Sequence, residues 1–453
     1  MRMYTSCFVA LMLTLAACTN SPQLEHEVTQ APQLRATTTT AATTSTAPTS
    51  STVPASSTVT ASSTGAESGS LTWGIDASAP STSWTRPPIN TPYEDQVYGT
   101  AIRRLTSAEG TRFNRNTYSR RQAENADGSL FMTYHGDAQY HVSALASGEL
   151  VRALPIDADS EPQWHPTDPN RVRHLAGSTS STGSLALFEI DVATGNSTVI
   201  ADLTERVRAT IDDAHYMIDR AEGSPSQDGS RWAWIVYNEA EQPRGIVSYD
   251  LATDTVVGIT TDLISGNVGW ASMSPTGAYV LVSYAEGTYS YNPDLSNIRL
   301  VTEAAEHSDI ALDKNGGDTY VYIDFHPTSV SSGWLTAVDL ATLERTLIFD
   351  LFDNANTSVH VSGKGYGRPG WVVVSTYNCK DAGAWSCQKV MAVELASGGR
   401  ILNLAHTYNC ANEYWTETHA VVNQAFDAVY FNSDGGSCGI DAEVYRLEVP
   451  PFE

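Results

Sequence analysis

From residue 71 to residue 453 the chain alternates between short hydrophobic runs and clusters of Gly, Asp, Asn, Ser and Pro. In Trp270–Ser283, for example, two apolar runs flank the turn residues Pro275 and Gly277. Runs of this length between turn residues are typical of β-strands, and no long stretch has the 3.6-residue period of a helix. The pattern therefore predicts an all-β domain over 71–453, with one short helical insert at Leu203–Ile218.

The strand–turn–strand pattern repeats along this domain. Its units begin near residues 121, 161, 222, 270, 307, 360 and 419. Several units continue with a second shared element, as in Leu187–Gly195 and Val247–Asp254. Units of about 40–50 residues that hold four strands are typical of propeller blades. We therefore predict a seven-bladed β-propeller, closed by pairing of Thr100–Leu105 with the last strand, Glu443–Val449.

The first 17 residues combine Arg2 with the apolar stretch Cys7–Leu13 and end in small residues. A basic start and a short apolar core are typical of a secretory signal, and this core is too short to span a membrane. Leu15–Cys18 resembles the bacterial lipobox, which implies a signal peptide over 1–17 and lipidation of Cys18. Because Thr19 follows in place of Asp, the resemblance implies the outer membrane or the cell surface. The alternative is an ordinary signal peptide with an incidental Cys18.

Residues 18–70 are dominated by Thr, Ser, Ala and Pro. Such a segment buries too little apolar surface to offset the entropy of ordering the chain. We therefore expect a disordered, flexible linker between the lipidated Cys18 and the propeller.

The charge of the chain limits its partners. Lys and Arg number 26 against 51 Asp and Glu, which gives a net charge of −25. Nucleic acids and anionic membrane surfaces would repel such a chain, so we expect neither to bind it unaided.

Four cysteines remain beyond the signal segment and the lipidation site, namely Cys379, Cys387, Cys410 and Cys438. An even number in an exported domain indicates two disulfides. The phase of the repeats places all four on one face, which we expect to be opposite the face where the inner strands begin. It favours the pairs Cys379–Cys387 and Cys410–Cys438. A metal site formed by all four thiolates is the alternative.

The repeat alignment places one residue of each blade at an equivalent position, four residues before the turn motif. These residues are Arg121, Glu161, Glu222, Trp270, His307, His360 and His419. A structural position in a β-core would carry Val, Ile or Ala, whereas six of these seven are ionisable. Charged groups that are enclosed together shift one another's pKa values and indicate a site of chemistry. We expect this ring to meet at the mouth of the central channel.

Each member of the ring suggests a chemical role. Imidazoles can act as general bases near neutral pH or bind a divalent metal, and Arg121 can bind a substrate carboxylate. The alternative is structural, since each imidazole could instead hydrogen-bond a turn of its own blade. Aromatic faces that could stack on sugar rings are expected from Tyr118, Trp164, Trp270 and Tyr366. We find neither His-Glu-x-x-His nor a phosphate loop, and we expect no serine-hydrolase elbow.

An exported, tethered, acidic propeller with a ring of His, Arg and aromatic residues resembles the propeller lyases for oligogalacturonate and ulvan. The resemblance implies β-elimination on uronate-containing glycans, with an acidic polysaccharide or oligosaccharide as substrate. In that chemistry a base must lie beside a cation that offsets the carboxylate charge. The resemblance implies His360 or His419 as base and Arg121 as that cation. It further implies a divalent metal (Mn²⁺, Ca²⁺ or Zn²⁺) on His307 and Glu222.

The Ser-Pro-x-Gly and Asp-Gly turns also resemble the propeller repeats of the Tol-Pal system, over about Tyr98–Val449. This second resemblance implies a different function. The protein would then be a non-catalytic envelope scaffold that binds a glycan or another protein, and the ring would be structural.

Overall fold

The computed structural model describes residues 71–177, 183–220, 222–303, 307–326, 328–351, 357–379, 383–439 and 441–453. The chain divides into two units, Met1–Thr64 and Gly65–Glu453, and every described residue belongs to the second. The expectations for the signal segment 1–17, the linker 18–70 and Cys18 lie outside the described residues. None of the helices in the described ranges combines the length and the apolar character that a bilayer crossing requires.

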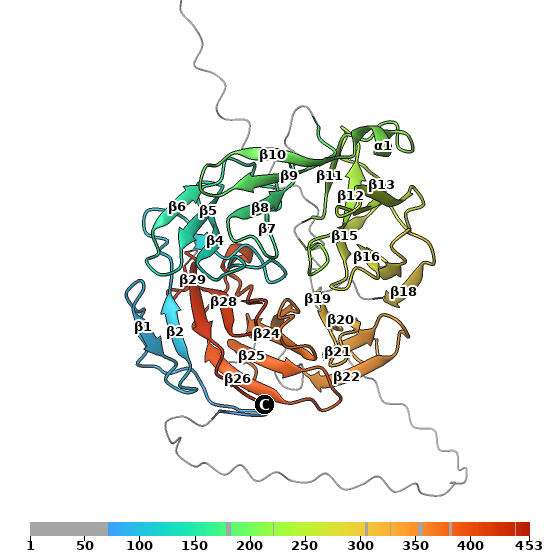
Figure 1. The fold of residues 1–453 in the computed structure, drawn as a ribbon. Coiled ribbons are helices and arrows are strands. Elements are labelled where there is room, and N and C mark those ends of the chain that lie inside the picture. The colour runs from blue at the N-terminus through green and yellow to red at the C-terminus, as the bar shows by residue number, and fades with distance from the viewer. Residues whose placement is uncertain are drawn as a thin grey trace, which may run out of the picture. The chain divides into compact units, whose positions relative to one another are not determined.

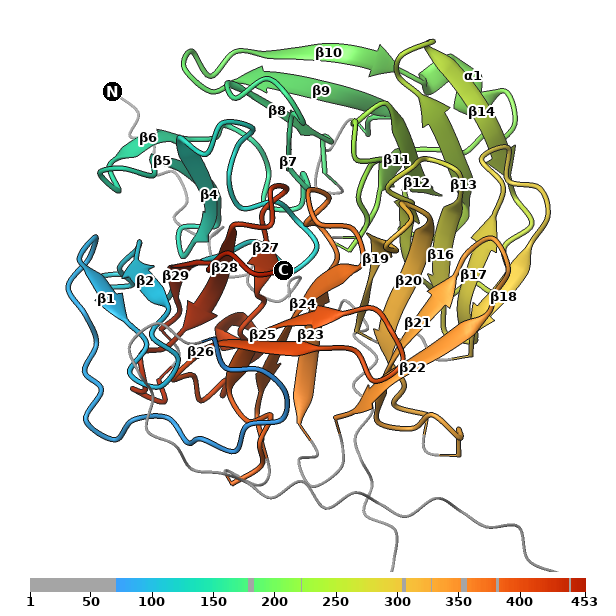
Figure 2. The same cartoon turned by 60° about the horizontal axis from the view of Figure 1, so that its bottom comes forward.

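The second unit is built of β-sheets, as the pattern predicts. Its described residues form five four-stranded antiparallel sheets and one nine-stranded sheet. The sheets lie around a common centre, with the first strand of each four-stranded sheet inward and the fourth outward (Figures 1 and 2). The predicted insert contains one short helix, α1 (Thr204–Arg208), followed by β11 (Tyr216–Ile218). A single 3₁₀ turn, η1 (Tyr414–Thr416), precedes the last inner strand among the described residues.

Neighbouring strands in each four-stranded sheet are consecutive in the chain. The first sheet consists of β7 (Gln163–Trp164), β8 (Arg171–His174), β9 (Ala186–Asp191) and β10 (Ser197–Asp202). The second consists of β11, β12 (Arg231–Tyr237), β13 (Pro243–Asp250) and β14 (Thr255–Thr260). The third consists of β15 (Val268–Met273), β16 (Val280–Tyr284), β17 (Gly287–Tyr291) and β18 (Arg299–Thr302). The fourth consists of β19 (Ser308–Leu312), β20 (Asp318–Ile323), β21 (Trp334–Asp339) and β22 (Arg345–Asp350). The fifth consists of β23 (Ser358–Ser362), β24 (Trp371–Tyr377), β25 (Lys389–Glu394) and β26 (Ile401–His406).

The nine-stranded sheet joins the two ends of the domain. Its strands from the beginning of the domain are β1 (Pro92–Glu94), β2 (Ala101–Arg104), β3 (Asn114–Arg115), β4 (Leu130–His135), β5 (Gln139–Ala144) and β6 (Leu150–Ala153). Its strands from the end of the domain are β27 (Val421–Val422), β28 (Ala428–Ser433) and β29 (Glu443–Glu448). Strand β2 pairs with β29, with Ile102 opposite Leu447, which confirms the predicted closing pair. Strand β3 joins the same sheet through one parallel pair with β29.

The repeated turn owes its shape to side-chain hydrogen bonds. In the turn after β15, the Gly277 amide donates to the Ser274 carbonyl (2.9 Å), and the Ser274 hydroxyl accepts from the Tyr279 amide (3.0 Å). Gly277 has a φ of +73°, a conformation that costs glycine little because it lacks a Cβ. The equivalent Gly229 has a φ of +67°. A short polar residue followed three positions later by Gly therefore marks each of these turns.

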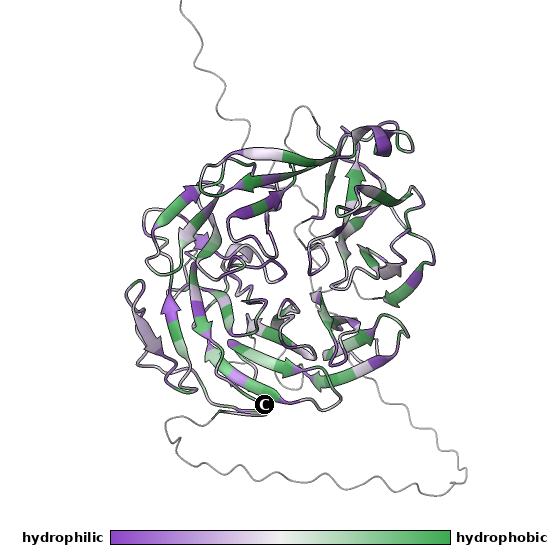
Figure 3. Ribbon diagram, viewed as in Figure 1, coloured by the Kyte–Doolittle hydropathy of each residue, from purple (hydrophilic) through white to green (hydrophobic). Residues whose placement is uncertain are grey.

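The core lies between neighbouring sheets rather than within one of them. Side chains of β9, β12 and β16, such as Leu187, Trp234 and Val282, pack into one continuous cluster and are fully buried. The strands carry the hydrophobic residues, whereas α1 and many of the connecting loops are hydrophilic (Figure 3). Burial of a Val or Leu side chain stabilises the fold by about 1.5–3 kcal/mol. The packed sheets thus form a rigid frame for the polar residues at the centre.

Two of the predicted units begin differently from the alignment. We expected inner strands beginning near residues 121 and 222, but the structure places β3 at Asn114–Arg115 and β11 at Tyr216–Ile218. Residues 121 and 222 lie in irregular segments, where Arg121 forms an ion pair with Asp219 and Glu222 forms one with Arg120. Near residue 222, polar contacts replace part of the sheet ladder, since the Ser224 hydroxyl donates to the Arg120 carbonyl at 3.0 Å.

Candidate functional site

Three histidines from consecutive parts of the chain meet at the centre of the domain. His307 directly precedes β19, His360 lies within β23, and His419 lies two residues before β27. The ring centroids of His307 and His360 are 4.8 Å apart, and those of His360 and His419 are 4.5 Å apart. Because β19, β23 and β27 are inner strands, residues far apart in the sequence contact one another at this point.

Glu417 completes the group. Its Oε2 atom lies 3.4 Å from Nε2 of His360 and 3.3 Å from Nε2 of His419. The three ligand-type atoms of His360, Glu417 and His419 all lie within 4.8 Å of one another. We name these three residues together with His307 the histidine cluster.

Several buried polar atoms of the histidine cluster make no contact of good hydrogen-bond geometry among the described residues, although Oε2 of Glu417 lies within 3.4 Å of two of them. They are Nδ1 of His307, both ring nitrogens of His360, Nε2 of His419 and Oε2 of Glu417. His360 is 1% exposed and His419 is 0% exposed. A buried polar group without a partner costs about 1–3 kcal/mol, so five such atoms in one cluster require an explanation. A bound cation would satisfy nitrogen and oxygen lone pairs that converge in this way.

The imidazoles of His360 and His419 are held in their neutral form. Burial lowers the pKa of His360 well below its ordinary value, and the nearby His419, His307 and Arg120 lower it further. Burial also lowers the pKa of His419, against the opposing effect of the Glu417 carboxylate. A neutral imidazole has a free lone pair, which is the form that binds a metal or accepts a proton.

The backbone at His419 adopts an unusual conformation. Its φ of +40° lies in the left-handed region, where residues other than Gly are uncommon. Such a conformation costs about 1–3 kcal/mol and persists only where the surroundings impose it. Here the Asn116 side-chain amide donates to the His419 carbonyl (2.9 Å), and the next amide, of Ala420, donates to the Ser375 hydroxyl (3.3 Å).

Three tyrosines enclose the histidine cluster. The Tyr118 ring lies 5.1 Å from that of His419, the Tyr414 ring lies 5.2 Å from it, and Tyr377 stacks on His360 at 4.8 Å. Burial is the largest cause that raises the pKa of each phenol above its ordinary value. These phenols are therefore protonated at neutral pH. Tyr118, one of the predicted aromatic residues, is thus brought to the histidines.

Two consecutive arginines enter the centre and turn in different directions. Arg121 forms ion pairs with Asp219 (3.0 Å) and Glu161 (3.8 Å), and all three side chains are buried. Its neighbour Arg120 lies nearer the histidines: it donates to the hydroxyl of Ser308 (2.8 Å), which directly follows His307. Arg121 was the predicted cation for a substrate carboxylate, but its charge is already matched by two buried carboxylates.

Glu222 and Trp270, two further members of the predicted ring, both contact Arg120. Glu222 forms an ion pair with Arg120 at 2.9 Å, and the Arg120 guanidinium lies 4.7 Å from the Trp270 ring centroid. Glu222 was predicted to bind metal with His307, but the carboxylate that the structure places among the imidazoles is Glu417. All seven predicted ring residues thus line the centre, in two groups: one around the histidines and one around the arginines.

Trp164 and Tyr366 contact other groups. Trp164 is buried, its indole N–H donates to the Ala123 carbonyl (3.2 Å), and it lines a cavity of about 310 Å³ with Glu124 and Asn423. Tyr366 lies four residues after the end of β23, and burial and the carboxylates of Asp309 and Asp318 raise the pKa of its phenol. The aromatic rings that the structure brings to the histidines are instead those of the three tyrosines and of Phe325.

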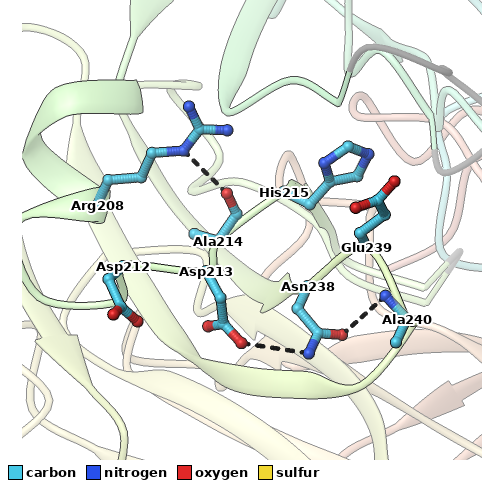
Figure 4. A pocket seen from close by; sticks show the side chains of 8 residues that line it. All are labelled: Arg208, Asp212, Asp213, Ala214, His215, Asn238, Glu239 and Ala240. Carbon is cyan, nitrogen blue, oxygen red and sulfur yellow. Dashed lines mark hydrogen bonds between the residues drawn. The ribbon is translucent and has the colours of Figure 1, made fainter.

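A second cavity, of about 430 Å³, lies beside α1 and contains no predicted site residue (Figure 4). The Arg208 side chain donates to the Ala214 carbonyl (2.9 Å), and Asn238 donates to Asp213 (3.3 Å). Arg208, Asp213 and Asn238 thus bond to other residues of the lining. Its lining consists of Arg208, Asp212, Asp213, Ala214, His215, Asn238, Glu239 and Ala240.

The four cysteines form the two favoured pairs, Cys379–Cys387 and Cys410–Cys438. The expectation that they lie opposite the beginnings of the inner strands is wrong. Cys379 Sγ lies 3.5 Å from the hydroxyl of Thr357, the residue directly before β23. The loop between β24 and β25, which carries this pair, returns to the face where the inner strands start, because strand direction alternates in an antiparallel sheet.

One short segment has the spacing of a serine-hydrolase elbow, Gly435–Gly439. It lies in the loop between β28 and β29 rather than in the strand-to-helix turn that exposes a nucleophile. The Ser437 hydroxyl donates to the carboxylate of Asp441 (2.8 Å), and Cys438 is held in a disulfide. The spacing is thus present in the sequence, contrary to expectation, and the structure places it in a loop between two strands.

Sequence reasoning missed Glu417, Arg120, Tyr377 and Tyr414. A signal for Glu417 was present, since it is spaced two residues before His419, and such residues point to the same side of an extended chain. Arg120 was missed because the alignment selected Arg121 from an Arg-Arg pair. Both arginines lie in a turn, in which the Arg121 amide donates to the Tyr118 carbonyl (3.3 Å), so the alternation of a strand does not give their directions.

No known protein family and no curated protein sequence matches the chain. Oligogalacturonate lyase from Vibrio parahaemolyticus has a similar structure, with 16% identity and a TM-score of 0.53, over 80% of this chain and 96% of that chain. An oligogalacturonate lyase in complex with manganese is also similar, with 15% identity and a TM-score of 0.55, over 80% and 96% of the two chains. TolB from Acinetobacter baumannii has 14% identity and a TM-score of 0.34, over 62% of each chain, which is too low to support a conclusion. The chain thus shares the propeller fold of the two lyases.

Proposed function

We propose that the protein is an exported, metal-dependent polysaccharide lyase that cleaves uronate-containing glycans by β-elimination. The observation that carries the proposal is the buried group of His360, Glu417 and His419, whose facing atoms lack hydrogen-bond partners among the described residues. The shared fold supports it, since one of the similar lyases is in complex with manganese. The substrate class, an acidic oligosaccharide or polysaccharide, follows from the same two neighbours.

The residues of the histidine cluster fit a divalent cation. His360, His419 and Glu417 would hold it through two imidazole nitrogens and one carboxylate oxygen, a donor set that suits Mn²⁺, Fe²⁺ or Zn²⁺ better than Ca²⁺, which prefers oxygen alone. When bound, such a cation supplies Lewis-acid stabilisation of negative charge on the uronate carboxylate. The Glu417 side chain is 18% exposed, so the proposed metal site borders solvent at Glu417.

With two imidazoles assigned as ligands, His307 is the histidine left to act as base. It is half-buried, directly precedes β19 and lies beside His360. In β-elimination His307 would accept the proton from C5 of the uronate. The C4–O bond then breaks, a C4=C5 double bond forms, and the departing oxygen takes up a proton. This assignment replaces His360 or His419 as the base.

Arg120 is better placed than Arg121 to offset the charge that develops on the uronate. Its guanidinium is fixed by Ser308, next to the proposed base, and by Glu222. A substrate carboxylate would compete with Glu222, whose side chain is 33% exposed, for the same guanidinium. Cation and base thus lie together, as elimination next to a carboxylate requires.

We further propose that the nine-stranded sheet comprises two blades, which gives a seven-bladed propeller. One blade would be β3–β6, and the other would be β27, β28 and β29 closed by β2. The single parallel pair between Glu443 and Asn114 would be the contact between them. We also propose lipid anchoring through Cys18 at the outer membrane or cell surface. The two disulfides fit an oxidising compartment.

One observation favours the alternative of a non-catalytic scaffold that binds a glycan or a protein. Arg121, Glu161 and Asp219 form a buried ion-pair network at the centre, and His360 and His419 are almost fully enclosed. Such a centre could serve only to hold the sheets together.

The experiment that separates the two functions measures the ultraviolet absorbance of unsaturated uronate products. The purified protein is incubated with a panel of uronate polysaccharides, with added Mn²⁺ or with chelator. We expect absorbance to rise with at least one glycan, to stop with chelator, and to be lost in His307→Asn although that variant still binds metal. No product from any glycan, together with tight binding of one of them, would establish the scaffold instead.

A further inference from the structure

We propose a second divalent-metal site at the tip of the β4–β5 hairpin, formed by His135, Asp137 and His141 and suited to Zn²⁺ or a related transition metal. These three residues contribute ligand atoms that all lie within 4.8 Å of one another. They share no residue with the histidine cluster, so this inference is independent of the proposed function.

The hairpin itself sets the geometry. His135 is the last residue of β4, Asp137 lies in the turn, and His141 is in β5. His135 pairs with Gln139 and His141 with Thr133, so the two histidines are diagonal neighbours on one face of the hairpin. Their rings stack with centroids 4.4 Å apart and an interplanar angle of 12°. Ligands supplied by one tight hairpin lie together without contributions from distant parts of the chain.

Both histidines contact the same carboxylate, one at each oxygen. Nδ1 of His135 lies 3.0 Å from Oδ1 of Asp137, and Nε2 of His141 lies 3.1 Å from Oδ2. The exposed fractions of the three side chains are 23%, 44% and 13% for His135, Asp137 and His141. The group is therefore open to solvent on one side, and a metal could reach it without unfolding of the hairpin.

The hydrogen bonds at His135 conflict with one another. Its Nδ1 accepts the backbone N–H of Asp137 at 3.3 Å, which requires a lone pair on that nitrogen. Its 3.0 Å approach to the Asp137 carboxylate requires a proton on the same nitrogen. A neutral imidazole cannot satisfy both neighbours. A cation bound between Nδ1 and the carboxylate would remove the repulsion between these facing lone pairs, and it would take the place of the longer contact of Nδ1 with the Asp137 N–H.

The chemistry of the ligands selects the metal. Two imidazoles and one carboxylate match Zn²⁺, Cu²⁺, Ni²⁺ or Co²⁺, whereas Ca²⁺ and Mg²⁺ prefer oxygen ligands. Three protein ligands leave further coordination positions for water or for an external group, unlike the closed four-ligand sites of structural zinc. The net charge of −25 also favours the approach of cations.

Zn²⁺ titration of the full chain against a chromophoric indicator, after treatment with chelator, tests the proposal. We expect wild type to bind two equivalents of Zn²⁺ if the histidine cluster also binds it, and His135→Asn/His141→Asn to bind one fewer than wild type. The matched control is His326→Asn, because the hydrogen bond of the His326 imidazole among the described residues is to the turn residue Thr328. This control should bind as many equivalents as wild type.

A second set of variants distinguishes metal binding at the hairpin from metal binding at the histidine cluster. His360→Asn/His419→Asn should retain the hairpin site, and Cu²⁺ bound to this variant should show coupling to imidazole nitrogen in its electron paramagnetic resonance spectrum. Asp137→Asn, which preserves the shape of the hairpin, should weaken Zn²⁺ binding at the hairpin by at least tenfold. Equal Zn²⁺ stoichiometry in wild type and His135→Asn/His141→Asn would overturn the proposal. Loss of Zn²⁺ only in the His360→Asn/His419→Asn variant would overturn it as well.

Discussion

Glu417 and His419 are separated by one residue, and Oε2 of the carboxylate lies 3.3 Å from Nε2 of the imidazole. The loop that carries both is fixed at its beginning by Asn409, whose side chain donates to the Thr416 carbonyl at 2.6 Å. It is also fixed by the disulfide between Cys410 and Cys438. The position of the Glu417 carboxylate thus depends on this loop, whereas the position of His360 depends on the register of β23.

Glu417→Gln should weaken binding of Mn²⁺, because the amide keeps the shape of the side chain but loses its charge. We expect a loss of at least the tenfold to about 100-fold that removal of an outer-shell partner causes at metal sites. Isothermal titration calorimetry with Mn²⁺, after treatment of the protein with chelator, measures the change in affinity. The control is Glu413→Gln on the same loop, where Glu413 pairs with the exposed Arg112. Equal affinities in the two variants would show that Glu417 is not a ligand.

Removal of the Cys410–Cys438 disulfide should weaken metal binding more than removal of Cys379–Cys387. The first pair spans 28 residues and anchors the loop of Glu417 and His419, whereas the second spans 8 residues in the hairpin loop between β24 and β25. Loss of a native disulfide costs about 2–5 kcal/mol in small exported domains, and the longer loop should cost more. The two double Cys→Ser variants are compared by Mn²⁺ affinity and by urea denaturation. If both bind Mn²⁺ as wild type does, the loop does not require this anchor.

The turns and the closing strand pair could be predicted from the sequence for two different reasons. A turn such as Ser274–Gly277 is specified by residues within four positions of one another. The pairing of β2 with β29 follows because a ring of sheets leaves no free edge. The beginning of β11 could not be predicted in the same way. Near residue 222, contacts from the distant Arg120 replace strand pairing, and no local pattern reports them.

Arg121→Ala should destabilise the fold strongly. It leaves the carboxylates of Asp219 and Glu161, which are 3% and 7% exposed at their side chains, without their shared cation. Breaking a buried ion pair from one side costs about 3–5 kcal/mol of unfolding free energy. The control is Arg112→Ala, whose pair with Glu413 is solvent-exposed and should contribute about 0–1 kcal/mol. Urea denaturation measures the unfolding free energy of both variants. A loss of unfolding free energy in Arg121→Ala as small as that in Arg112→Ala would contradict this structural role and favour a role of Arg121 in binding substrate.

The metal-free protein should lose stability as the pH falls below about 6.5, the ordinary pKa of histidine. Burial lowers the pKa values of His360 and His419 in the folded state, so the unfolded state takes up protons first and is favoured at low pH. Each such histidine contributes a slope of up to about 1.4 kcal/mol per pH unit, between its unfolded and folded pKa values. Above pH 6.5 this contribution is absent, because both states are neutral.

The double variant His360→Asn/His419→Asn isolates this effect from that of the other histidines. Its unfolding free energy, measured by urea denaturation between pH 5 and pH 8 in the presence of chelator, should change less steeply with pH than that of wild type. Parallel curves for the two proteins would mean that these imidazoles already titrate normally in the folded state.

The candidate site was only partly accessible to sequence reasoning, for a geometric reason. Equivalent positions in the repeats lead to the same axis, so His307, His360 and His419 could be grouped without a structure. Which charged neighbour turns toward the axis depends on irregular segments outside the strands. Arg120 rather than Arg121, and Glu417 rather than Glu222, lie nearest the histidines for this reason.

The most direct test of the central claim is anomalous X-ray scattering from crystals grown with Mn²⁺, recorded near the manganese absorption edge. We expect an anomalous peak within coordination distance of the His360 and His419 imidazoles and of the Glu417 carboxylate, and no such peak in crystals of Glu417→Gln grown at the same Mn²⁺ concentration. A wild-type map without a peak there, in which these side chains bond to water or to one another, would contradict the account.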